Sequence, residues 1–197
     1  MIWNKHPAVM FDQFPTSPAD FLDWNRQATS FESMSAFRNL NLTLTGGGDP
    51  ERLSATSITP NSFDVLGVPP KLGRTFNSQD GTPASAPTIV ISDGLWKRRF
   101  ASDANIVGKE ISLNGMPHTV IGVMPAGFQL PPSFTFGGRL INSNTDVWIA
   151  DDRSSQQTIR DSRNQFVIAK LKPGFTLAQA QAEMNSIAAG LAQKYPD

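Results

Sequence analysis

The sequence contains two histidines, His6 and His118, and acid–base catalysis near neutral pH would have to depend on one of them. No Gly-x-Ser-x-Gly motif marks an activated serine, and no cysteine supplies a thiolate. His118 stands in an alternating segment typical of a solvent-facing strand, and His6 stands near a terminus that we expect to fray. We therefore predict no catalytic residues. A hydrolase centred on His118 is the weakest of three hypotheses.

The residues that could bind phosphate or metal lack the required pattern. The glycines from Gly46 to Gly48 precede Asp49-Pro50-Glu51 and not Lys-Ser or Lys-Thr, so they predict a turn. Asp151-Asp152 and Asp161 lack the alternating oxygen ligands of a calcium-binding loop. We predict neither a cofactor nor a metal site.

Nucleic acid is not an expected partner. Seventeen basic and seventeen acidic residues cancel, and no long run of like charge occurs. Lys97-Arg98-Arg99 is the one short basic cluster, and on a helix three consecutive side chains fan over more than half of the circumference. The cluster predicts a polar helix face beside Trp96 and Phe100.

Three aromatic residues, Phe128, Phe134 and Phe136, lie in a stretch rich in Pro, Gly, Ser and Asn. Phenylalanine brings a large contact area, so these residues are a candidate interaction surface for a sugar or a hydrophobic ligand. Packing beneath a long loop explains them equally well.

In the first half of the chain, Ser17 followed by Pro18 predicts the start of a helix. Alternating leucines predict a strand over 39–45, and the return through 52–59 completes a hairpin. Residues 60–66 predict a short helix that ends at Gly67.

The second half begins with a β-branched strand over 88–92, and Ser92 can cap a helix that runs to Phe100. Asn114-Gly115 suits a type I′ turn between strands over 109–113 and 116–124. A long loop is expected over 125–145, and strands are expected over 146–149 and 166–169.

A capping box from Thr176 to Gln179 predicts the start of the last helix. Its apolar residues recur at three-to-four spacing, which predicts a face packed on the core. These residues are Leu177, Ala180, Met184, Ile187 and Leu191.

The elements predict an α+β fold with two subdomains. Polar, Pro- and Gly-containing stretches at 77–87 and 151–163 indicate the two junctions. The longest apolar runs, such as 120–124, are far shorter than a membrane-spanning helix, and the N-terminal residues lack the apolar core of a signal peptide.

Ordered segments along nearly the whole chain resemble the periplasmic core domain of MacB-like ABC transporter permeases, especially those common in acidobacteria. Examples are Leu72-Gly73-Arg74-Thr75-Phe76 and Ile89-Val90-Ile91-Ser92. The full set covers residues 18–24, 30–34, 41–53, 61–68, 72–76, 89–100, 106–109, 113–115, 120–125 and 169–174.

This resemblance implies a discontinuous Porter-like subdomain over 1–80 and 161–197, interrupted by a mostly β Sabre-like subdomain over 81–160. The family's core domain usually continues past the helix that ends near Tyr195, so we expect a truncated second part. The domain would lie outside the cytoplasmic membrane between two membrane helices.

In such permeases the domain relays conformational change without catalysis, and ATP is bound by a cytoplasmic ATPase. The rest of the permease and that ATPase are the implied partners, and the resemblance also implies a homodimer of the full-length protein. The alternative is a free-standing extracytoplasmic ligand-binding protein that uses the loop from Phe128 to Phe136.

Overall fold

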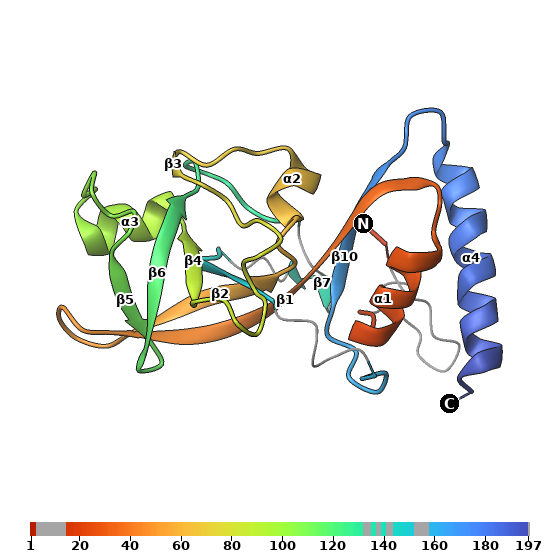
Figure 1. Cartoon of the computed structure of the whole chain (residues 1–197), viewed down its shortest axis with the longest axis horizontal. Coiled ribbons are helices and arrows are strands. Elements are labelled where there is room, and N and C mark those ends of the chain that lie inside the picture. The colour runs from red at the N-terminus through yellow and green to blue at the C-terminus, as the bar shows by residue number, and fades with distance from the viewer. Residues whose placement is uncertain (3–14, 132–134, 137–138, 141–143, 152–157, 197) are drawn as a thin grey trace. The chain divides into compact units, whose positions relative to one another are not determined.

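The computed structural model describes all residues except 3–14, 132–134, 137–138, 141–143, 152–157 and 197 (Figure 1). The chain divides into two compact units. The terminal unit contains Met1–Ala36 and Ser155–Asp197, and the central unit contains Phe37–Ser154. No helix among the described residues is both long and apolar enough to cross a membrane.

The terminal unit is built from two helices and two paired strands. In chain order these are α1 (Pro18–Gln27), the first part of β1 (Phe31–Thr45), β10 (Phe166–Leu171) and α4 (Leu177–Lys194). The helices contact each other and lie beside the strands (Figure 1). Their shared core contains Phe21, Trp24, Met34, Ala36, Val167 and Met184.

Both helices of this unit begin where the sequence predicts. Ser17 Oγ accepts a hydrogen bond from the Asp20 backbone at 3.1 Å, and Thr176 and Gln179 form the reciprocal capping box. The expectation for Leu177 is wrong, because its side chain is 75% exposed. It is the first residue of α4, and the buried stripe begins one turn later at Ala180.

Six strands of the central unit form a closed ring. They are β1, β2 (Glu51–Ile58), β9 (Val147–Ala150), β4 (Thr88–Ile91), β6 (Met116–Val123) and β5 (Glu110–Leu113), each paired with the next. β5 then pairs with β1, where Leu113 lies opposite Leu44. Closing the ring leaves these strands without a long unpaired edge.

Shorter elements complete the central unit. They are α2 (Ser62–Leu66), β3 (Leu72–Gly73), α3 (Asp93–Phe100), and the paired strands β7 (Thr135–Phe136) and β8 (Arg139–Leu140). Leu95 and Trp96 of α3 join the apolar side chains of the ring strands in one core. Gly67 ends α2 in the left-handed conformation, with φ of 67°.

The predicted turn at Asn114-Gly115 also closes the ring. Both residues have positive φ, 51° and 81°, as a type I′ turn requires. The Asn114 backbone N–H donates to the Thr43 carbonyl at 2.8 Å, and Asn114 Oδ1 accepts from the Thr43 N–H at 2.8 Å. The side chain of a turn residue thereby extends the β1–β5 pairing.

The α+β class is confirmed, and the predicted strands and helices are present with small changes at their ends. The exception is β1, which begins at Phe31 and not at residue 39. The stretch predicted as a loop at 125–145 includes the β7–β8 pair. Residues 37–80 lie in the same compact unit as 81–154, and the division at 80/81 and 160/161 stays a prediction.

Replacing Asn114 separates the two roles of this turn. Asn114→Gly keeps the positive φ but removes the acceptor for Thr43, so we expect the free energy of unfolding to fall by about 1 kcal/mol. Asn114→Ala adds the strain of a left-handed alanine, about 1 kcal/mol more. Urea unfolding measures both, and a glycine variant as stable as the parent would show that the side-chain bond is dispensable.

Candidate functional site

The residues considered for catalysis or metal binding do not come together. His118 lies on β6, half-buried, with Nδ1 2.9 Å from the Met116 carbonyl oxygen. Asp151 is buried and lies 3.9 Å from Arg38 Nη2. Within the described ranges, no group of three or more His, Asp or Glu side chains could hold a metal ion. His6 and Asp152 lie outside the described residues.

Of the three aromatic residues proposed as an interaction surface, only Phe128 has a described side chain. It is half-buried, and its ring lies 5.7 Å from Phe63 and 5.4 Å from Trp148. Phe134 is outside the described residues, and for Phe136 only the strand position is described. Phe128 therefore contributes to packing, and the surface itself stays a prediction.

The basic residues of α3 all have acidic or carbonyl partners. Lys97 Nζ lies 2.7 Å from Asp93, and Arg98 Nη2 lies 2.8 Å from Glu51 and 2.9 Å from Asp146. Arg99 Nη2 donates to the Asp49 carbonyl at 2.9 Å. These contacts connect α3 to β2 and to the residues just before β2 and β9, so the cluster serves the fold of the central unit.

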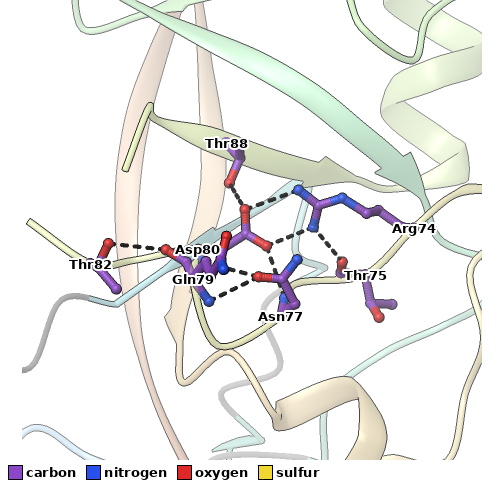
Figure 2. Close-up of polar contacts among 7 residues, drawn as sticks. All are labelled: Arg74, Thr75, Asn77, Gln79, Asp80, Thr82 and Thr88. Atoms are coloured by element: carbon purple, nitrogen blue, oxygen red, sulfur yellow. Dashed lines mark hydrogen bonds and ion pairs between the residues drawn. The ribbon is translucent and has the colours of Figure 1, made fainter. Parts of the chain in front are cut away.

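The densest polar cluster lies in the Asp80 loop, residues 74–88 (Figure 2). Asp80 is 5% exposed, and its carboxylate accepts from Arg74 at 2.6 and 3.1 Å. It also accepts from the Asn77 N–H at 2.8 Å and from Thr88 Oγ1 at 3.0 Å. One carboxylate thus joins the exit of β3 to the first residue of β4.

Burial raises the pKa of Asp80, but its hydrogen bonds to Arg74, Asn77 and Thr88 outweigh burial and bring the pKa below its ordinary value of 3.8. The carboxylate stays ionised at neutral pH. It anchors the loop and does not exchange protons there.

Two glycines let the start of the Asp80 loop lie directly on β6. A Cβ on Gly73 would be 2.2 Å from the Ile121 carbonyl oxygen, and a Cβ on Gly122 would be 2.2 Å from the Arg74 carbonyl oxygen. Both are contacts with backbone that cannot give way easily. The sequence interpretation of 77–87 as a junction missed this loop, although Asn77 and Asp80 have the three-residue spacing of a turn held by side chains.

A second carboxylate cluster joins α3 to the segment after α2. Asp93 accepts from Lys71 Nζ and from Lys97 Nζ, each at 2.7 Å. Hydrogen bonds from these lysines lower the pKa of Asp93 despite its burial. Lys71 Nζ also lies 4.7 Å above the Trp96 ring, within cation–π range.

In the terminal unit, Glu183 of α4 holds the turn between α1 and β1. Its carboxylate accepts from the Thr29 N–H at 2.7 Å, Thr29 Oγ1 at 2.6 Å and the Ser30 N–H at 3.0 Å, and also from Ser30 Oγ. Burial opposes ionisation, but these four donors lower the pKa of Glu183 to about 2. The sequence does not indicate this contact, because the partners are 153 and 154 residues apart.

Comparison with protein families matches residues 3–187 to the model for the MacB-like periplasmic core domain. A curated relative, the probable export ATP-binding/permease protein MacB of Pseudomonas entomophila, is 24% identical over 130 residues. That alignment covers 66% of this chain and 18% of the relative's length.

Several solved structures have a similar fold. The periplasmic region of MacB from Actinobacillus actinomycetemcomitans aligns with a TM-score of 0.63 at 18% identity, over 97% of this chain and 80% of that chain. A domain of a putative permease from Porphyromonas gingivalis gives 0.62 at 12% identity, over 95% and 73%. The extracellular domain of the transporter YknZ from Gram-positive bacteria gives 0.61 at 16% identity, over 96% and 86%.

The Asp80 carboxylate should matter more to stability than an exposed ion pair. We expect Asp80→Asn to lower the free energy of unfolding by about 2 kcal/mol, because a buried charged acceptor with four donors is lost. Asp103→Asn is the matched control, since Asp103 pairs with Lys109 at 2.5 Å in a more exposed position and should change stability little. Equal losses in urea unfolding would contradict this ranking.

Glu183 should make the stability of the terminal unit depend on pH in the acidic range. Its folded pKa is depressed, so its contribution is complete above the ordinary pKa of 4.5 and is lost as pH falls toward 2. Glu183→Gln should be less stable than the parent by about 1–2 kcal/mol at pH 7, and the gap should narrow toward pH 2. Urea midpoints across pH test this. Glu32→Gln, at an exposed pair with Lys170, is the control, and a gap that is constant with pH would refute the Glu183 contribution.

Proposed function

The chain belongs to the MacB-like periplasmic core domain family, and from this premise we propose that it relays conformational change within an ABC transporter permease without catalysing a reaction. It is a periplasmic domain of a MacB/FtsX-like permease. The observation that carries the proposal is β1, a strand of 15 residues whose first part belongs to the terminal unit and whose remainder belongs to the central unit.

A continuous hydrogen-bonded strand transmits displacement along its length better than a flexible linker does. In the terminal unit, β1 starts directly after the Thr29-Ser30 turn that Glu183 holds. In the central unit, its last residues pair with β5 beside the Asn114 contact. A displacement of α4 would therefore reach the strand ring through anchored contacts.

The proposed partners in this relay are the rest of the permease and a cytoplasmic ATPase. ATP would be bound by that ATPase and not by this domain. Two copies of the full-length permease would work as a homodimer. The surface around Phe128, Phe134 and Phe136 is a candidate for contacts with substrate or partner proteins. No cofactor takes part in the proposed role.

The relay can be tested by distance measurements in the full-length permease with its ATPase, reconstituted in nanodiscs. This chain has no cysteine, so once any cysteines elsewhere in the permease and its ATPase are replaced, spin labels can be placed on Met116→Cys in the central unit and Gln193→Cys in the terminal unit. We expect the distance distribution between the labels to shift when ATP and vanadate trap the ATPase. The two labels lie in different units, so a change in their separation reports a displacement of one unit with respect to the other during the ATPase cycle.

The control pair, Met116→Cys and Ser78→Cys, lies within the central unit and should keep one distribution in both states. Unchanged distributions for both pairs, in a transporter whose ATPase responds to vanadate, would show that this domain does not relay the ATPase cycle.

A further inference from the structure

The loop between β10 and α4 and the first residue of α4 together form an exposed apolar tip, residues 172–177, at the end of the terminal unit where β10 turns into α4 (Figure 1). Phe175 is 41% exposed and Leu177 is 75% exposed, the most exposed large apolar side chain among the described residues. Lys172 stands at the base of this tip and is itself exposed. Neither apolar residue contributes to the core of the terminal unit.

Local structure enforces this exposure. The Phe175 N–H donates to the Lys172 carbonyl at 3.2 Å, and Gly174 between them has φ of 89°. The Thr176–Gln179 capping box fixes the first turn of α4, so Leu177 cannot reach the core without breaking the cap. The tip therefore presents two apolar side chains in a defined arrangement.

The charges beside the tip favour an anionic or zwitterionic partner. Lys172 makes no ion pair with any described residue, and Lys170 nearby is neutralised by Glu32 at 2.9 Å. The other acidic side chain at this end, Glu183, is occupied by Thr29 and Ser30. An apolar tip with a lysine beside it matches the boundary between acyl chains and phosphate headgroups.

The backbone direction indicates that the tip lies at the end of the terminal unit toward which the N-terminus points. Ile2 pairs antiparallel with Val167 of β10. Going from Ile2 back to Met1 therefore follows the direction in which β10 runs toward Lys172. The Lys172 N–H also donates to the Ser30 carbonyl at 2.9 Å, so the start of β1 lies at this end too. A membrane helix preceding the domain would approach from this side.

We propose that residues 172–177 insert Phe175 and Leu177 into the phospholipid surface of the membrane, with Lys172 at the headgroups. The orientation rests on the proposed function, because only a permease supplies the preceding membrane helix. Two side chains give weak binding by themselves. In the permease, the membrane helix that precedes the domain would hold it at the membrane. This raises the effective concentration of the two side chains at the lipid surface and makes their contact persistent.

The experiment uses the cysteine-free chain with an environment-sensitive fluorophore on Ala178→Cys, one residue beyond the tip. An N-terminal histidine tag tethers the protein to phosphatidylcholine–phosphatidylglycerol vesicles that carry a nickel-chelating lipid. We expect blue-shifted, brighter emission on these vesicles. The same label on Gln193→Cys, about 22 Å farther along α4, should not respond.

Phe175→Gln with Leu177→Gln should reduce the vesicle-induced response roughly tenfold while the tether stays bound, because both inserting groups are removed. Met116→Gln, which removes an exposed apolar residue from the central unit, is the matched control and should leave the response intact. Lys172→Gln should weaken the response with phosphatidylglycerol and not with phosphatidylcholine alone. Urea midpoints verify that each variant folds, and Leu177→Gln alone replaces the double variant if that one does not.

Three results would overturn the proposal. They are no response at Ala178, equal responses at Ala178 and Gln193, or a response that survives the double substitution. If adding unlabelled protein in the absence of vesicles produced the same fluorescence change, the tip would be assigned to a protein contact instead. The nanodisc distance measurement is independent of this assay, so failure of membrane insertion can be distinguished from failure of the relay.

Discussion

Strand β1 is the element on which both compact units depend. Its first part contributes Met34 and Ala36 to the core of the terminal unit, and Leu42 and Leu44 lie in the core of the central unit. Around the first of these pairs, residues 34–37 are buried without interruption, so neither face of the strand is free there. A strand that serves two cores cannot shift its register without moving side chains out of both.

The sequence predicts those elements whose determining contacts are local. Ser17, Ser92 and Thr176 each cap a helix through a backbone N–H three residues ahead. Asn114-Gly115 forms a turn whose geometry depends on these two residues alone. In such cases the partner is visible in the sequence beside the residue that binds it.

The sequence does not predict contacts chosen by tertiary arrangement. Nothing near Asn114 indicates Thr43, 71 positions away, and nothing near Arg98 indicates Glu51. The first half of β1 escaped prediction because its consecutive buried residues lack the alternation of a half-buried strand. Leu177 fits the helical spacing of its core face, yet it lies beyond the end of the surface on which α4 packs.

The same distant contacts bear on whether the domain can catalyse a reaction. A carboxyl group that exchanges protons near neutral pH needs a raised pKa, which burial without donors provides. Asp80, Asp93 and Glu183 are partly or largely buried, but their donors lower each pKa. Each therefore stays ionised and holds two segments of the chain together. These buried carboxylates, whose partners the sequence does not indicate, keep loops and helices in place.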